Sequence, residues 1–229
     1  MIANDPGFLR LVLPDEALGA WTREALNAAG LSLSQRLPGG RDFVLDDDPL
    51  IVDWLGFGLA SLTVHEADIP VYVEHGVADL GVARQHVLRE RDARVYRPFT
   101  FSFEAGVMAL VAPEGTELGK LVERPHLRVA TPWRHTAQDF FASRGWNVEL
   151  IALTQEVELA PLLGLADAVL MAVEDELALT RQGLAIVEPI APCRAKLLAN
   201  RATGRERLAQ IARLVDLLNL ARPVRPTGA

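Results

Sequence analysis

Three consecutive carboxylates, Glu174, Asp175 and Glu176, directly follow the short apolar segment Ala168–Val173. A segment of that length and composition is typical of a buried strand, and ligands of open α/β sheets bind beyond the carboxyl ends of strands. Carboxylates in that place have two interpretations. They form an acidic pocket that selects a cationic ligand, or they are a solvated helix N-terminus, where acidic side chains interact favourably with the helix dipole.

Arg134 and His135 occupy a similar place after the apolar segment Leu127–Thr131. Cationic side chains at the start of a helix are suited to an anion, because the first backbone N–H groups of the helix point toward the same ligand. Ordinary surface residues would give the same pattern, so both interpretations stay open. The sequence thus offers a candidate anion-binding group beside a candidate acidic group.

No residues have the spacing of a metal site or the surroundings of a nucleophile. Cys193 is the only cysteine, which excludes an intramolecular disulfide and a C-x-x-C zinc site. The histidines lack metal-ligand spacing and are His65, His75, His86, His126 and His135. We therefore expect no protein-bound metal site and assign no catalytic residue.

The composition of this 229-residue chain is that of a globular protein. Half of its residues are hydrophobic and its net charge is −7, whereas nucleic acids and anionic membranes attract concentrated Lys and Arg. The mean hydropathy is +0.16 and the isoelectric point is about 5.3. The first ten residues lack a signal-peptide pattern, and no apolar run reaches the roughly 18–20 residues that span a bilayer. We expect a cytoplasmic protein with neither a nucleic-acid nor a membrane partner.

Short apolar segments alternate with helical segments along the chain, which is typical of βα units. The expected strands are residues 8–13, 42–45, 60–65, 78–83, 94–99, 106–112, 127–131, 148–153, 168–173, 185–187 and 195–199. The expected helices are residues 15–29, 67–75, 133–144, 157–163, 175–181 and 203–220. Residues 46–49 are expected to form a turn, and residues 113–125 a long polar connection.

The polar connection separates two sets of βα units, which predicts an α/β protein with two lobes and a ligand cleft between them. We expect lobe I to comprise residues 1–104 and 188–229. Lobe II is expected to comprise residues 105–187.

Two stretches of sequence resemble a known family. The first is Asp68-Ile-Pro-Val-Tyr-Val-Glu-His-Gly-Val-Ala-Asp-Leu-Gly-Val82, and the second is Val157-Glu-Leu-Ala-Pro-Leu-Leu-Gly-Leu-Ala-Asp-Ala-Val169. Together with Leu127-Arg-Val-Ala-Thr131, they are similar to the catalytic subunit of ATP phosphoribosyltransferase, which opens histidine biosynthesis. The resemblance runs from about residue 11 to the last expected helix. The sequence ends where the long form of the family continues into a C-terminal regulatory domain, so we expect it to resemble the short form.

The resemblance implies a two-lobed fold similar to the type II periplasmic binding proteins, and a histidyl-tRNA-synthetase-like regulatory chain in a homo- or hetero-oligomer. It implies displacement at C1 of phosphoribosyl pyrophosphate by N1 of ATP, with Mg²⁺. Because a nucleotide and a sugar phosphate are polyanions, the site must supply backbone N–H groups and cationic side chains. The candidate substrate-binding residues are Glu158, Asp167, Glu174, Asp175, Glu176, Ala178, Arg134 and His135. Asp167 has the alternative role of anchoring a turn.

The phosphate loop departs from the family pattern. The family reads roughly Asp-Leu-Val-x-Thr-Gly-x-Thr-Leu, whereas this chain reads Met171-Ala-Val-Glu-Asp-Glu-Leu-Ala-Leu179. Asp175 and Glu176 replace Thr-Gly, and Ala178 replaces the second Thr. Carboxylates therefore stand where the resemblance implies a phosphate, and like charges 4 Å apart repel by roughly 1 kcal/mol in water and about 4 kcal/mol at an effective dielectric near 20.

Other phosphate-handling or glycine positions of the family also differ. They are Pro14-Asp15-Glu16-Ala17, His65, Arg84-Gln85-His86, Gly106-Val107 and Pro132-Trp133-Arg134. Two hypotheses stay open. The chain is the enzyme and works with a regulatory chain, or it is a non-catalytic paralogue that binds another small ligand or regulates a catalytic subunit. A periplasmic solute receptor is a third possibility, which the absence of a signal-peptide pattern disfavours.

Overall fold

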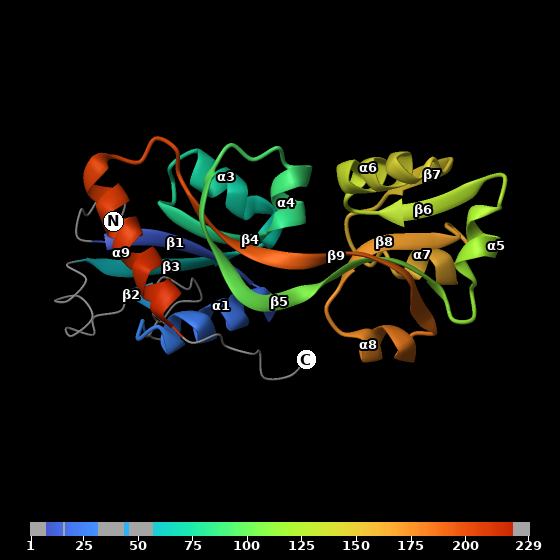
Figure 1. Cartoon of the computed structure of the whole chain (residues 1–229), viewed down its shortest axis with the longest axis horizontal. Helices are drawn as coiled ribbons and strands as arrows, with labels where there is room; N and C mark the ends of the chain where they lie inside the picture. Colours follow the sequence, from blue (N-terminus) through green and yellow to red (C-terminus); the bar gives the residue numbers. More distant parts are fainter. Residues whose placement is uncertain (1–7, 16, 32–43, 46–56, 222–229) are drawn as a thin grey trace. The chain divides into compact units, whose positions relative to one another are not determined.

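The structure of the protein is a computed structural model that describes residues 8–15, 17–31, 44–45 and 57–221 (Figure 1). The chain divides into two compact units. Unit 1 is formed by residues 1–103 and 194–228, and unit 2 by residues 104–193. Two long strands, β5 (Tyr96–Pro113) and β9 (Leu184–Ala199), contribute residues to both units.

The sheet of unit 1 is built around β1 (Phe8–Pro14). This strand lies between β3 (Gly58–Val64) and β4 (Leu80–Arg84) and is parallel to both. The short β2 (Val44–Leu45) is antiparallel to β3, and the end of β9 is antiparallel to β4. Because β1, β3 and β4 run in the same direction, their last residues lie at one edge of the sheet, which we call the unit 1 carboxyl edge.

The helices of unit 1 follow its strands in the chain. They are α1 (Ala17–Ala28), the 3-10 turn η1 (Glu66–Asp68), α3 (Ile69–Glu74), α4 (Gln85–Glu90) and α9 (Arg205–Leu220). Ile69 and Val73 of α3 pack against Val12 of β1 and Leu198 of β9 in one buried cluster. The sheet and these helices together fix the ends of β3 and β4.

Asp79 joins the amino ends of the unit 1 strands to α9. Its carboxylate accepts hydrogen bonds from the backbone N of Arg10 at 2.8 Å and from Arg10 Nε at 3.0 Å. Arg207 of α9 forms a second ion pair, with 2.5 Å between Nη1 and Oδ2. Burial opposes ionisation of Asp79, but the hydrogen bonds and charges of the two arginines outweigh it and hold the pKa of this carboxyl below its usual value.

The sheet of unit 2 is built around β8 (Ala168–Val173). This strand is antiparallel to β5 and parallel to β6 (Leu127–Thr131), which is parallel to β7 (Val148–Ala152). The last residues of β6, β7 and β8 therefore lie at one edge, which we call the unit 2 carboxyl edge. This is the kind of edge at which ligands of open α/β sheets bind.

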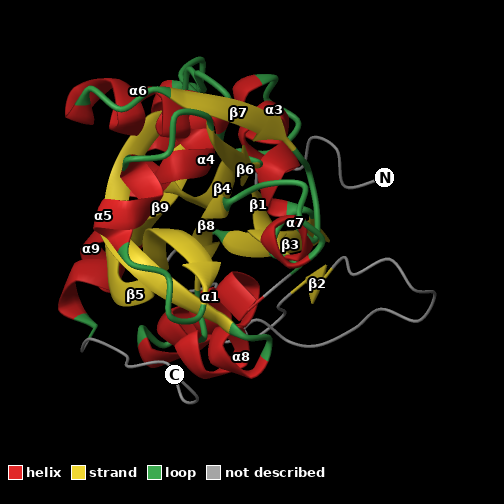
Figure 2. Cartoon of the chain, turned by 90° about the vertical axis from the view of Figure 1, so that its right-hand side faces the viewer, coloured by secondary structure: helices red, strands yellow, loops and turns green. Residues whose placement is uncertain are grey.

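Helices cover both faces of the unit 2 sheet. They are α5 (Leu118–Val122), α6 (Arg134–Arg144), α7 (Leu159–Leu162) and α8 (Glu176–Arg181). Leu121 of α5 and Phe141 of α6 pack on one face, whereas Ala160 of α7 and Leu179 of α8 pack on the other. Figures 1 and 2 both show α6 and α8 on opposite sides of β8.

Most of the expected elements are present, and the differences concern the two long strands, two short helices and the segment around β2. Expected strands 94–99 and 106–112 are parts of the single strand β5, and strands 185–187 and 195–199 are parts of β9. The expected polar connection contains α5, and α4 was not expected. Of the expected strand 42–45, only β2 is described, and the expected turn at 46–49 lies outside the described residues.

Candidate functional site

Three loops meet at the unit 2 carboxyl edge. The Thr131 hydroxyl, at the end of β6, donates to the backbone oxygen of Leu170 in β8 at 2.8 Å. The same hydroxyl accepts from the backbone N of Trp133 at 3.0 Å, and the Thr131 carbonyl accepts from the backbone N of Leu153 at 3.2 Å. These bonds fix the starts of the loops after β6 and β7 beside the neighbouring strands.

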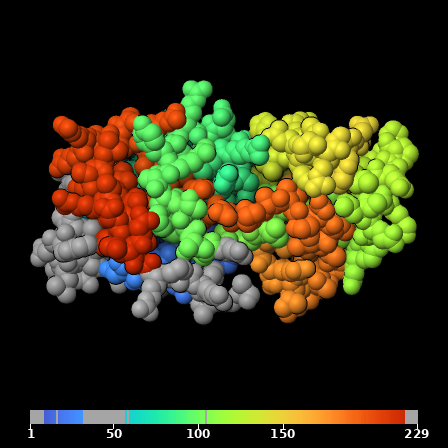
Figure 3. All heavy atoms as spheres, viewed as in Figure 1, coloured from blue at the N-terminus to red at the C-terminus, as the bar shows by residue number. Residues whose placement is uncertain are grey.

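The loop after β8 is closed on itself by Asp175. This residue has an extended backbone at the N-cap of α8, and its Oδ1 accepts from the backbone N of Leu177 at 2.9 Å and of Ala178 at 3.1 Å. A side-chain oxygen at this position normally satisfies N–H groups that have no partner inside the helix. Glu174, Asp175 and Glu176 are all exposed, and α8 lies at the surface of unit 2 (Figure 3).

Gly106 of β5 brings a second backbone segment against this loop. Its φ is +93°, and a Cβ at this position would lie 2.5 Å from the backbone oxygen of Val173 and 3.3 Å from the Cα of Glu174. A side chain would therefore clash with the end of β8 as well as strain the backbone. Glycine at this position, one of the departures from the family pattern, is what allows β5 and the loop to approach so closely.

Six of the predicted site residues follow β6 or β8 and lie at the unit 2 carboxyl edge. Arg134 and His135 are the first two residues of α6, directly after β6, and both are exposed. Because β6 and β8 are parallel neighbours, these residues share the unit 2 carboxyl edge with Glu174, Asp175, Glu176 and Ala178. Cationic and acidic side chains therefore lie at the same edge, at the starts of two helices that cover opposite faces of the sheet.

Asp167 lies at the other edge of the same sheet. It precedes β8, and its carboxylate accepts from the backbone N of Arg128 at 2.9 Å and from Arg124 Nη1 at 2.7 Å. Burial opposes ionisation of Asp167, but the Arg128 hydrogen bonds and both arginine charges outweigh it and lower the pKa of the carboxyl. In this position Asp167 anchors the turn into β8 to the start of β6.

Glu158 follows β7 in the chain, at the start of α7. It stands at the N-cap position of α7, where its side chain makes no capping hydrogen bond, and it is half-buried. Its neighbours Val157 and Ala160 are buried against Val169 in the core. The place of Glu158 is therefore determined by the packing of α7 on the sheet.

The unit 1 carboxyl edge holds a buried ion pair that sequence reasoning did not predict. Arg84 is the last residue of β4, and its Nη1 lies 2.8 Å from Oε2 of Glu66. The backbone N of Arg84 also donates to Oε1 of Glu66 at 2.5 Å. The exposed fractions of the two side chains are 4% and 7%. Arg84 had been recognised as a departure from the family glycine, but its partner had not. The available signal was a charged residue at the end of an otherwise apolar buried strand, which needs a partner.

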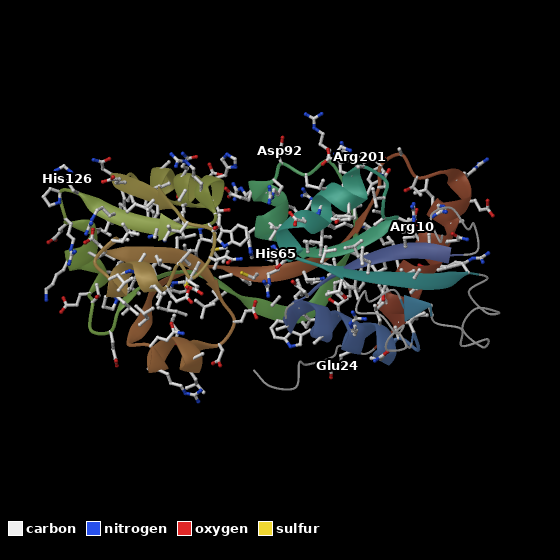
Figure 4. The ribbon with its side chains drawn as sticks, turned by 180° about the vertical axis from the view of Figure 1, so that it is seen from behind. Arg10, Glu24, His65, Asp92, His126 and Arg201 are labelled. Atoms are coloured by element: carbon white, nitrogen blue, oxygen red, sulfur yellow. The ribbon has the colours of Figure 1, made fainter. Side chains whose placement is uncertain are left out.

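Two histidines adjoin this pair. Burial, together with the charge of Arg84, lowers the pKa of His86 to about 3, so this imidazole is neutral. His65 is exposed at the end of β3, and its Nδ1 accepts from the backbone N of Ala67 at 3.3 Å. Figure 4 shows His65 and Arg10 toward opposite ends of the unit 1 strands. Within the described residues, no group of three or more His, Cys, Asp or Glu side chains is placed to hold a metal ion.

Comparison with known proteins gives concordant matches in sequence and structure. The family model described as "HisG: ATP phosphoribosyltransferase" matches residues 65–220. The ATP phosphoribosyltransferase of Bordetella pertussis is 32% identical over 219 residues, which cover 93% of this chain and 95% of that protein. The ATP phosphoribosyl transferase (HisG:HisZ) complex from Thermotoga maritima contains a chain that matches with a TM-score of 0.70 and 24% identity, covering 93% of this chain and 98% of that one.

The fold is also shared with binding proteins. The periplasmic aliphatic sulphonate binding protein SsuA from Escherichia coli matches with a TM-score of 0.62 and 13% identity, over 95% of this chain and 73% of that chain. The expected α/β fold similar to periplasmic binding proteins is therefore confirmed. Among the described residues, no helix is both long and apolar enough to cross a membrane.

Proposed function

Because the chain belongs to the ATP phosphoribosyltransferase family, we propose that it converts ATP and phosphoribosyl pyrophosphate into phosphoribosyl-ATP and pyrophosphate, the first step of histidine biosynthesis. The observation that carries the proposal is the 32% identity to a bacterial enzyme of that name over 93% of the chain. The comparisons do not favour the alternative of a non-catalytic paralogue. Consumption of ATP suits a cytoplasmic protein.

In this reaction N1 of ATP attacks C1 of the ribose, and the bond between C1 and the pyrophosphate oxygen breaks. Pyrophosphate leaves with the bonding electrons, so the protein must hold two polyanions in line and stabilise the departing charge. We assign Arg134 and His135 to this electrostatic role, since both are exposed at the unit 2 carboxyl edge. Asp167 supports the sheet through Arg124 and Arg128, and we do not assign it a contact with substrate.

Mg²⁺ would enter the site bound to the phosphates of the substrate. It usually keeps several waters and binds through one or two carboxylates together with substrate phosphates. The described residues supply no set of three His, Cys, Asp or Glu ligands, but exposed carboxylates such as Glu174 and Glu176 lie at the proposed edge. They could supply one or two of its ligands, and the bound ion would neutralise charge on the pyrophosphate.

A regulatory chain similar to histidyl-tRNA synthetase is the proposed partner. The Thermotoga maritima structure is a HisG:HisZ complex, and this chain covers 98% of the matched subunit. We therefore propose that the active form is a hetero-oligomer with a HisZ-like chain.

The direct test is formation of phosphoribosyl-ATP by the purified chain, alone and with HisZ-like chains. We expect turnover that depends on ATP, phosphoribosyl pyrophosphate and Mg²⁺. Absence of product with every regulatory chain tried, from a preparation shown to be folded by circular dichroism, would reject the proposed function.

A further inference from the structure

The end of β4 extends beyond its pairing with β1. That pairing covers Leu80 and Gly81, whereas the strand continues to Arg84. Beyond the pairing, the side chain of Glu66 contacts the strand, since Oε1 accepts from the backbone N of Arg84 and Oε2 lies 2.8 Å from Nη1 of the same residue. One carboxylate thus fixes both the backbone and the side chain of the last residue of β4.

Stability alone gives little reason for this buried pair. The exposed fractions of the two side chains are 4% and 7%, and the attraction between buried charges is largely offset by the cost of removing them from water. Apolar side chains of similar volume often give equal or greater stability. The hydrogen bond from the backbone N of Arg84 to Glu66 has a different effect, because it joins η1, which follows β3, to the end of β4.

Each member of the pair adjoins an exposed residue at the unit 1 carboxyl edge. His65 precedes Glu66, Gln85 follows Arg84, and the side chains of His65 and Gln85 are exposed. Nδ1 of His65 accepts from the backbone N of Ala67 at 3.3 Å, so Nε2 carries the hydrogen of the neutral ring, and the Gln85 amide adds two donors. Ligands of open α/β sheets bind at such an edge, where these donors are suited to the oxygens of a nucleotide or sugar phosphate.

We propose that Glu66 is a positioning residue for the reaction. Its carboxylate joins η1 to the end of β4 and thereby holds His65 and Gln85 in the arrangement that binds substrate, while Arg84 compensates its buried charge. The inference rests on the proposed function, because it takes the substrates to be ATP and phosphoribosyl pyrophosphate. It goes further in assigning a role in substrate binding to a buried residue that does not itself contact substrate.

Two double variants separate the hydrogen bond from stability. The apolar variant, Glu66→Leu with Arg84→Met, removes both charges and the hydrogen bond. The amide variant, Glu66→Gln with Arg84→Met, also removes both charges, but its new side-chain carbonyl can still accept from the backbone N of residue 84. Because the amide variant also buries an NH₂ group that lacks the guanidinium's partner, we expect it to be no more stable than the apolar variant.

The exposed pair of Glu117 and Lys120 in unit 2 supplies the matched control, in which both are changed to Gln. Titration calorimetry with Mg²⁺ measures the Kd of ATP and of phosphoribosyl pyrophosphate for each full-length chain, and chemical denaturation measures stability. We expect the apolar variant to raise the Kd of at least one substrate at least tenfold and the amide variant to recover most of that loss. The control should leave both Kd values and the stability unchanged.

A role in stability alone predicts the opposite order, with the amide variant binding no better than the apolar one. That order would overturn the inference, as would wild-type affinity in the apolar variant or binding of neither substrate by the wild type. Turnover with a HisZ-like chain is measured separately. Product from the wild type with unchanged Kd values in the apolar variant rejects the inference alone. The expected Kd values without product from any protein reject the proposed function alone.

Discussion

Asp79 links β1 to α9, so its removal should reduce the stability of unit 1. It is buried and accepts hydrogen bonds from Arg10, while Arg207 forms an ion pair with it. We expect Asp79→Asn to lower the free energy of unfolding by roughly 2–4 kcal/mol. This range lies between the cost of losing a hydrogen bond to a charged group and the cost of breaking a buried ion pair. Urea denaturation measures this loss, and exposed Asp216→Asn should change stability by less than about 0.5 kcal/mol.

The same carboxyl predicts the direction of an acid transition. Its folded-state pKa lies below the ordinary value, so its contribution is fully present above the unfolded-state pKa near 4 and is lost as pH falls through the folded-state value. Wild-type stability should therefore fall below about pH 4. The fall should be shallower in Asp79→Asn, and an equal slope in both proteins would contradict the assignment.

The Glu66–Arg84 pair makes a second residue-scale prediction. Both side chains are buried, so Glu66→Ala leaves an arginine charge without its main partner and should cost about 3–5 kcal/mol. Replacing both, as Glu66→Leu with Arg84→Met, should recover most of that loss, because a buried ion pair is often replaceable by apolar residues of similar volume. Chemical denaturation of the single and double variants measures the difference. A double variant as unstable as the single one would mean that the pair does not act as a unit.

At the scale of elements, Gly106 allows β5 to pass close to the backbone at the end of β8. Gly106→Ala should destabilise the chain by about 1–3 kcal/mol, because its φ is +93° and a Cβ would lie 2.5 Å from the Val173 oxygen. Gly119→Ala is the control, since this glycine lies in α5 with nothing within 4 Å and alanine favours a helix by about 1 kcal/mol. We expect the melting temperature to fall in Gly106→Ala and to rise in Gly119→Ala. Equal shifts in the two variants would contradict the clash at Gly106.

Sequence patterns predicted most strands and helices but misjudged where some of them stop. The expected interruptions at residues 100–105 and 188–194 are absent, because these residues continue the single strands β5 and β9. Pro98, Pro189 and Pro192 lie within these two strands, although proline is disfavoured in strand interiors. All three prolines are exposed in the structure, so their missing N–H groups leave no buried ladder position without a donor.

The short helices are difficult to predict for a different reason. Each of α4 and α5 is too short for a 3.6-residue period to stand out. They exist because Val87, Leu88 and Leu121 are buried against the sheets, which is a tertiary effect that local sequence does not reveal.

The sequence predicts which residues of the candidate site share an edge of the sheet, because this depends on strand order. It does not predict which side chains form ion pairs or hydrogen bonds with one another. Residues after parallel strands share an edge, so the grouping of Arg134 and His135 with the acidic loop follows from the βα pattern. The ion pair between Arg84 and Glu66 joins the end of β4 to η1, and the hydrogen bond between Asp167 and Arg124 spans 43 residues. Such partners are fixed by the fold, which is why motif resemblance alone could not distinguish an anchoring carboxylate from a ligand-binding one.

For the molecule as a whole, the proposed hetero-oligomer with a HisZ-like chain makes a further prediction. Sedimentation of the chain with a HisZ-like chain should give a species heavier than either alone, and this species should have a higher kcat than the chain by itself. Independent sedimentation of both chains, with no change in kcat, would contradict the proposed hetero-oligomer while leaving the catalytic proposal open to direct assay.

The most direct measurement is the initial rate of phosphoribosyl-ATP formation by the purified wild-type chain with a HisZ-like chain, as phosphoribosyl pyrophosphate is varied. The proposed function predicts product, with a rate that saturates in phosphoribosyl pyrophosphate and requires ATP and Mg²⁺. Absence of product from the folded protein would contradict the proposed function.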